Sequence, residues 1–283
     1  MKVTSLLLAF ALSLVQPKAS GQDTTCINPT RLAIVGGLTL GTVTAIHIYQ
    51  RNAWWLGPSS DFWFVNDWHV ARNVDKLGHM YGAYLACNAF DYALQWSGIE
   101  RHRSEVYGAM LAFAFQLYVE TEDGFHTNYG FSPGDAIADI VGAMIPLAQT
   151  TFPVLENFRL KWSYFPSKTY RDALAEGQAR TFIDDYEGQI FWLAMDPHFI
   201  SRDGFMKVVP AWLGLSVGAG VNNLNPSRGG GDLVVYFSLD YNFRRIETAS
   251  NFLRGLFSVL DFFHLPAPAI SVERGKVRFG VFY

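Results

Sequence analysis

The feature that most limits the possible folds is an uncharged run of nineteen residues, Leu32–Gln50, between Arg31 and Arg51. About 20 mostly apolar residues are enough for a helix to cross the hydrocarbon core of a membrane. The run is rich in glycine and threonine, which favours close packing between helices, and Trp54 and Trp55 follow it, where interfacial aromatic residues are common. We therefore predict a membrane-spanning helix here, with a buried core helix as the alternative.

The amino terminus has the pattern of an export signal. Lys2 precedes the apolar run Ser5–Val15, and the small residues Ala19-Ser20-Gly21 follow. A positive start, a short apolar run and a small-residue exit are typical of a secretory signal peptide. Residues 1–21 are therefore predicted to be a signal peptide, and an N-terminal anchor is the alternative.

Composition narrows the class of protein further. Only 17% of the 283 residues are charged and 50% are hydrophobic, whereas about 25% of the residues in ordinary soluble domains are charged. This composition excludes a disordered chain, and the net charge of −3 provides no basic surface for nucleic acid. The two cysteines, Cys26 and Cys87, exclude a disulfide scaffold, although an oxidising compartment would allow them to pair.

Three more apolar segments are predicted to be helices. Asp75–Trp96 and Ser104–Thr121 each contain fourteen consecutive uncharged residues, and a run of sixteen between Asp139 and Glu156 covers most of Ser132–Phe152. These runs are short for a membrane span and ample for a core helix. The expected fold is therefore mainly α: a bundle of about four apolar helices, membrane-embedded or membrane-apposed, over residues 30–155.

The sequence changes character near residue 156. Apolar and polar residues alternate in Lys207–Val221, Leu233–Phe243 and Val277–Tyr283, which is typical of strands. Residues 156–283 are therefore expected to form a smaller α+β extension with a few antiparallel strands. An outer-membrane barrel component is a weaker alternative, because such barrels need at least eight strands and only three or four are expected.

Charged residues in the three later helices recur at helical spacing. Side chains three or four positions apart share one helix face, and the glycines beside them allow neighbouring helices to approach closely. If these faces meet, they form one polar cluster, which comprises Asp75, Lys76, His79, Glu120, Asp123, Asp135 and Asp139.

Five carboxylates cannot be buried together while all are ionised, so protons or cations must compensate them. An imidazole and several carboxylates can together coordinate a divalent metal ion. The candidate ligands are His79, Asp75 and Glu120. In an enzyme, His79, Glu120 and Asp123 would be the candidate catalytic residues. A structural network of salt bridges is the alternative.

The same residues carry a resemblance to a known family. Four motifs occur in the family's order over roughly residues 66–149: Asp75-Lys76-Leu77-Gly78-His79, then residues 120–125, 129–135 and 138–143. This order resembles the YfiM-like family (domain of unknown function 2279), described as predicted periplasmic lipoproteins, and is distantly similar to VanZ-like membrane proteins. The resemblance implies a location and key positions, and no activity. The chain differs in lacking a lipobox cysteine and in having Asp139 where many relatives have asparagine.

We therefore expect an exported, membrane-associated cell-envelope protein that faces the periplasm. Its His/carboxylate cluster is either structural or binds a cation or a lipid headgroup, and its expected partners are membrane lipid and other envelope proteins. The alternative is a metal-assisted hydrolase or transferase that acts on a lipid-linked envelope substrate and uses a divalent metal.

Overall fold

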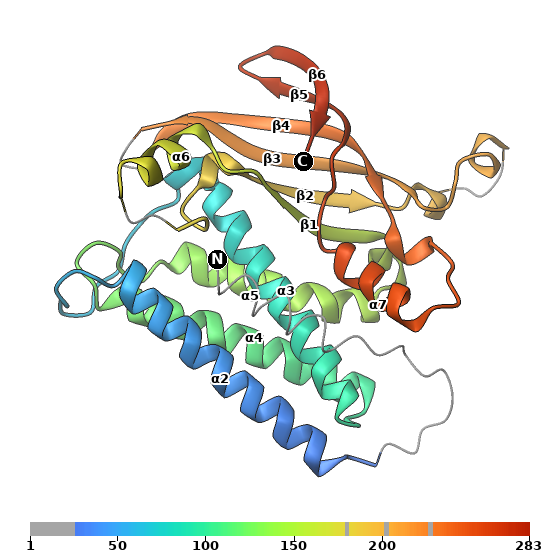
Figure 1. The fold of residues 1–283 in the computed structure, drawn as a ribbon, viewed down its shortest axis with the longest axis horizontal. Helices are drawn as coiled ribbons and strands as arrows, with labels where there is room; N and C mark the ends of the chain where they lie inside the picture. Colours follow the sequence, from blue (N-terminus) through green and yellow to red (C-terminus); the bar gives the residue numbers. More distant parts are fainter. Residues whose placement is uncertain (1–25, 179–180, 201–203, 226–228) are drawn as a thin grey trace. The chain divides into compact units, whose positions relative to one another are not determined.

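The computed structural model describes residues 26–178, 181–200, 204–225 and 229–283; the predicted signal peptide lies outside this range. The chain divides into two compact units. We call residues 22–147 with 167–185 the helical unit, and residues 148–166 with 186–283 the sheet unit. Figure 1 shows the helices and strands of both.

The helical unit contains the long helices of the chain. Its first helix begins where the sequence supplies a cap, because the Asn28 side chain accepts a hydrogen bond from the Arg31 amide at 3.0 Å. Pro29 then occupies the first turn, where its missing N–H costs nothing. The helices are α2 (Pro29–Ala53), α3 (Val74–Trp96), α4 (Arg101–Gly124), most of α5 (Pro133–Thr151) and the short α6 (Lys168–Ala175).

Small residues let α3 approach α4 and α5 closely. A Cβ atom built on Gly142 of α5 would lie 2.0 Å from the carbonyl oxygen of Met80, and one on Gly108 of α4 would lie 2.9 Å from that of Cys87. The core beside these contacts is made mainly of alanines, together with the buried Cys87. Cys26 and Cys87 are both free thiols, so they do not form the disulfide that export would allow.

The expected bundle of four apolar helices is wrong. Among the described residues, α2 is the one helix long and apolar enough to cross a membrane, with a mean hydropathy of 1.6 over its most apolar window. The uncharged runs of the three later helices instead pack against one another through small residues, and these helices also carry buried charged side chains. The fold is α+β, because a six-stranded sheet accompanies the helices.

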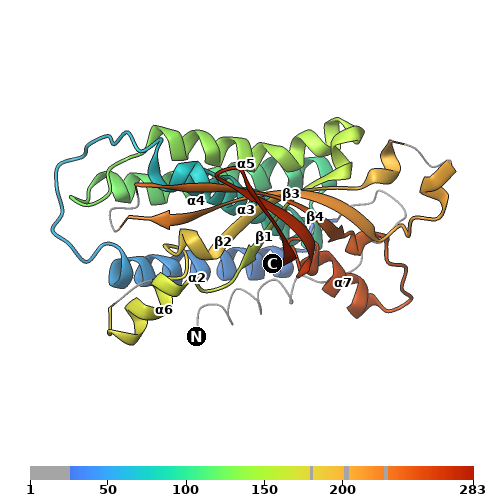
Figure 2. The same ribbon diagram turned by 90° about the horizontal axis from the view of Figure 1, so that it is seen from above.

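The sheet unit is built on six antiparallel strands that follow one another in chain order. The strands are β1 (Phe158–Tyr164), β2 (Gln189–Met195), β3 (Leu213–Leu224), β4 (Gly230–Tyr241), β5 (Ala267–Glu273) and β6 (Lys276–Phe282). The two longest, β3 and β4, run side by side in Figure 2. Helix α7 (Asn251–Leu260) lies between β4 and β5 in the chain.

The outer edge of β1 is partly paired. The Trp162 amide donates to the carbonyl of Phe262 at 3.1 Å, and the His264 amide donates to the carbonyl of Trp162 at 3.1 Å. The segment after α7 therefore lies along β1 and leads directly into β5, on the other side of the sheet order.

Candidate functional site

Lys76 is the centre of one half of the predicted cluster. Its ammonium nitrogen lies 2.7 Å from Asp135 Oδ1, 2.8 Å from Asp67 Oδ1 and 3.0 Å from Asp75 Oδ2. Gly134 leaves the space for this side chain, since a Cβ atom there would lie 3.0 Å from Cε of Lys76. One buried ammonium group thus bridges three carboxylates that come from α3, α5 and the segment before α3.

The starts of α3 and α5 hold these groups in place. Ser132 caps α5, because its hydroxyl accepts from the Asp135 amide at 3.0 Å and donates to Asp67 Oδ1 at 2.7 Å. Before α3, three consecutive residues from Ala71 to Asn73 have positive φ angles of 45°, 55° and 66°. This left-handed turn sets the direction in which α3 begins, immediately before Asp75 and Lys76.

His79 is the centre of the other half of the predicted cluster. Its Nδ1 lies 3.3 Å from Asp139 Oδ1 and 3.7 Å from Glu120 Oε1, and its Nε2 lies 3.8 Å from Asp135 Oδ1. Gln116 donates to Asp139 Oδ1 at 2.8 Å. One turn of α3 therefore presents Lys76 and His79 to carboxylates on both α4 and α5.

Glu120 and Asp123 are held by contacts of different kinds. The Ser132 amide donates to Glu120 Oε2 at 3.2 Å, which ties the start of α5 to α4. Asp123 Oδ1 accepts from the indole N–H of Trp55 at 2.6 Å. Asp123 thus lies at the margin of the cluster, beside Trp55 rather than in ion-pair contact with His79.

Burial and the neighbouring charges shift the proton affinities of the acidic groups. Burial raises the pKa of Glu120 to about 8, that of Asp135 to about 7 and that of Asp123 to about 6. Burial acts to lower the pKa of His79, but Asp139 and Asp135 outweigh it, and the net pKa lies well above the ordinary value. Near pH 7 the cluster without a metal therefore keeps protons on both His79 and Glu120.

One carboxylate oxygen in the centre has no partner. Asp139 is 0% exposed, and its Oδ2 has no hydrogen-bond partner among the residues that the structure describes. A buried carboxylate oxygen left in this way is costly. Potential ligand atoms of two groups lie within 4.8 Å of one another: His79, Glu120 and Asp139 form one group, and Asp75, His79 and Asp135 form the other.

Sequence reasoning missed two partners in the cluster. Asp67 belongs to an irregular, aromatic-rich segment, where no periodicity points to a shared face. The spacing of four places Gln116 on the same face of α4 as Glu120, but the predicted cluster included only ionisable residues and so omitted this partner of Asp139.

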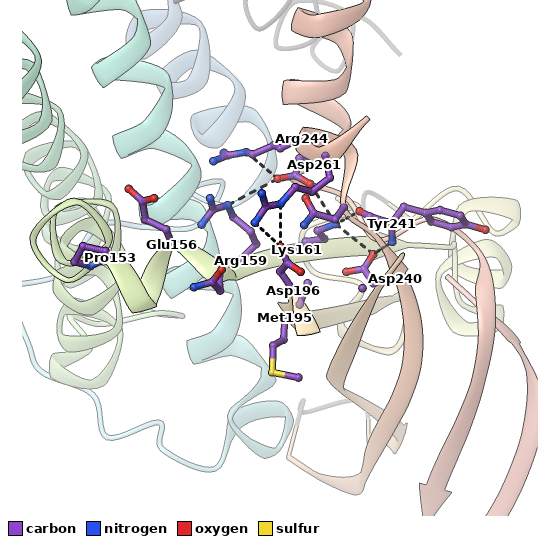
Figure 3. Close-up of a pocket in the computed structure, with 15 residues that line it drawn as sticks. Pro153, Glu156, Arg159, Lys161, Met195, Asp196, Asp240, Tyr241, Arg244 and Asp261 are labelled. Carbon is purple, nitrogen blue, oxygen red and sulfur yellow. Dashed lines mark hydrogen bonds and ion pairs between the residues drawn. The ribbon is translucent and has the colours of Figure 1, made fainter. Parts of the chain in front are cut away.

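A second charged cluster in the sheet unit was also not expected. Lys161 of β1 lies 3.2 Å from Asp240 Oδ1 and 3.6 Å from Asp261 Oδ1, and Arg244 lies 2.9 Å from Asp261 Oδ2. Figure 3 shows these side chains converging. They line a cavity with a volume of about 270 Å³. Acidic and basic groups alternate here, so the ion pairs largely compensate one another.

Comparisons with known proteins locate the family resemblance. No curated protein and no solved structure matches the chain. A family model described as a predicted periplasmic lipoprotein matches residues 61–150, which include every residue of the Lys76 and His79 clusters. This description confirms the expected location of the protein in the cell envelope. The segment that builds the cluster, residues 61–150, thus matches DUF2279, the family of predicted periplasmic lipoproteins that its motifs resemble.

Proposed function

We propose that this is a non-enzymatic envelope protein whose helical unit binds a divalent metal ion between His79, Glu120 and Asp139. The observation that carries the proposal is the buried Oδ2 of Asp139, which lacks a partner at the centre of an excess of carboxylates. A metal ion would supply the missing positive charge and connect α3, α4 and α5.

The spacing of the ligand atoms suits a metal of the zinc type. Zinc bonds to imidazole nitrogen and carboxylate oxygen are about 2.0–2.2 Å long, so ligand atoms in a tetrahedral site lie about 3.3–3.6 Å apart. Nδ1 of His79 lies 3.3 Å from Asp139 Oδ1 and 3.7 Å from Glu120 Oε1. Only small side-chain movements are therefore needed to place three ligands around one ion.

Neighbouring groups would orient these ligands. Gln116 fixes the Asp139 carboxylate, the Ser132 amide fixes Glu120, and Asp135 lies near the second ring nitrogen of His79. A carboxylate beside the other ring nitrogen is a common support for a metal-bound histidine.

The charge balance favours a cation over an anionic lipid headgroup. Six carboxyl groups lie in or beside the cluster, whereas Lys76 and His79 are the basic residues at its centre and His126 lies near Asp123. An anion would add to the repulsion among the carboxylates, whereas a divalent cation would replace the protons on His79 and Glu120. Because the ligands come from three helices, metal binding would add directly to folding stability.

Metal analysis and thermal unfolding of the purified full-length protein test the proposal. We expect about one bound zinc or manganese ion per chain, and an unfolding temperature that falls when EDTA removes the ion. Asp139→Asn should abolish both effects. The matched control is Asp61→Asn, an exposed aspartate of the same unit, which should leave both unchanged. A protein with no bound metal, whose unfolding temperature does not respond to zinc, manganese or EDTA, would contradict the proposal.

A metal-assisted hydrolase is the second candidate, and one observation favours it. The side chain of His79 is 25% exposed, whereas those of Glu120 and Asp139 are almost completely buried. An ion bound here could keep one position open to water, as catalytic zinc sites do. Metal-dependent hydrolysis of a fluorescent lipid-linked phosphodiester, lost in Glu120→Gln, would favour the enzyme. The absence of turnover by the metal-loaded protein would favour the structural role.

A further inference from the structure

The exposed face of the six-stranded sheet is lined with apolar side chains, whereas the exposed face of an ordinary soluble sheet is polar. Side chains on successive residues of a strand point to opposite faces, so cross-strand partners form rows that lie on one face or the other. One row consists of hydrocarbon side chains from five adjacent strands: Leu193, Val217, Phe237, Ile270 and Phe279. These side chains are between 36% and 80% exposed.

The next row lies one residue away on each strand and has the opposite character. It joins Ala194, Ser216, Ser238 and Ala269, and all four are buried. The buried ion pair between Lys161 and Asp240 belongs to the same side of the sheet. That side also buries Trp192, Val234 and Tyr236, so it mixes polar and apolar groups, whereas the other side exposes aliphatic and aromatic side chains.

The apolar face extends beyond a single row. Leu215 pairs with Leu239 on β3 and β4, and both are exposed. Val277 and Val281 add two exposed side chains on β6. A continuous apolar surface of this kind is rare on a soluble monomer and marks an interaction site.

We propose that this face of the sheet unit contacts the acyl chains of a membrane. Three observations favour lipid over a protein partner. The central row offers no hydrogen-bonding or charged side chain, whereas protein interfaces usually combine an apolar centre with a polar rim. An outward-facing band of aliphatic and aromatic side chains is the pattern of strands that face lipid. The same chain carries α2, a helix apolar enough to enter a bilayer.

The contact is with one face and does not require the sheet to span the bilayer. The sheet order ends at β6, and the open edge of a sheet is not tolerated in hydrocarbon because its backbone groups lack partners. The apolar face therefore lies on the membrane, with the buried side of the sheet turned away from it. This surface is separate from the metal centre, which is built from residues of the helical unit.

Site-specific fluorescence quenching on the full-length protein in vesicles tests this proposal. Vesicle binding alone is not sufficient, because α2 would also cause it. Variants with one added cysteine, Val217→Cys and Phe237→Cys, carry an environment-sensitive dye at that position. Glu247→Cys, an exposed position of the same unit, is the matched control. Cys26→Ser removes the exposed native thiol. Cys87 can stay, because it is completely buried and burial raises its pKa to about 12.

The vesicles contain phosphatidylethanolamine and phosphatidylglycerol, with a nitroxide on a fraction of the acyl chains. We expect severalfold stronger nitroxide quenching at positions 217 and 237 than at 247, and the reverse order with aqueous iodide. Circular dichroism and the metal response of each variant show that the fold and the helical unit are intact. Equal nitroxide quenching at all three positions would overturn the proposal. Protection from both quenchers together with disulfide-linked dimers of Phe237→Cys would also overturn it, and would assign the face to a second copy of the chain.

Discussion

Replacing Glu120 with glutamine tests whether this buried side chain carries a proton in the metal-free protein. Glutamine has nearly the same shape as protonated glutamic acid, but it cannot ionise. Glu120 is 2% exposed, and burial raises its pKa to about 8, whereas an unfolded glutamate has a pKa of about 4.3. The folded state therefore binds the proton more tightly, and the stability it contributes is lost as the pH rises from about 4.3 through 8.

The size of the effect follows from the two pKa values. Preferential proton binding by the folded state is worth about 3 kcal/mol at pH 6 and less than about 1 kcal/mol at pH 8. Between these pH values, Glu120 alone should therefore lower the free energy of unfolding of the wild type by about 2 kcal/mol. The Glu120→Gln variant should lack this part of the decrease, because its side chain remains neutral throughout.

Urea unfolding in mild detergent with EDTA, followed by tryptophan fluorescence at pH 6, 7 and 8, measures the difference. The control is Asp61→Asn, which should keep the full pH dependence of the wild type. If Glu120→Gln loses stability between pH 6 and 8 as steeply as the wild type, Glu120 is not the protonated group. A Glu120→Gln variant that is strongly destabilised already at pH 6 would show that the carboxylate is ionised in the native state.

Three further substitutions test the packing and charge arrangement. Lys76→Met removes the ammonium group shared by three carboxylates and should cost about 3–5 kcal/mol of unfolding free energy at neutral pH; a loss below about 1 kcal/mol would contradict this role. Gly142→Ala should destabilise the protein by about 1–3 kcal/mol or more, because the new methyl group meets the carbonyl oxygen of Met80 at 2.0 Å. The matched control Gly36→Ala has open space around it and should not lower the melting temperature. Asn28→Ala removes the cap of α2 and should reduce the stability of its first turn by about 1 kcal/mol, measured as faster amide exchange there; unchanged exchange would show that the cap contributes nothing.

The helices of the site could be predicted more reliably than its complete set of contacts. The repeated spacing of four on three segments indicated that Asp75, His79, Glu120 and Asp139 share inward faces, and the structure joins His79 to Glu120 and Asp139. Asp67 could not be found in this way, because its position depends on a long irregular segment. Asp123 could not be placed accurately either, since its main partner is the indole of Trp55.

Too few strands were predicted, because the first strands of the sheet lack the expected alternation. β1 contains Arg159 and Lys161, and β2 is an almost continuous apolar run, so neither shows a clean alternation of hydrophobic and polar residues. β3 and β4 do alternate, but the alternation cannot show which face is buried, and here the face with most of the exposed side chains is the apolar one. The prediction of a bundle of four apolar helices was wrong for a related reason. Uncharged runs of fourteen residues fit a core of small residues as well as they fit lipid.

The order of the strands has a consequence for how the sheet unit folds. Every strand pairs with the strand before it in the chain, so the sheet can grow one hairpin at a time as the polypeptide emerges, without waiting for distant partners. The exception is the segment that follows α7, which must return to the edge of β1. This return brings Asp261 to Lys161, so the ion cluster of the sheet unit can form only after most of the chain is in place. A reporter near Lys161 would therefore follow the final step of folding rather than its beginning.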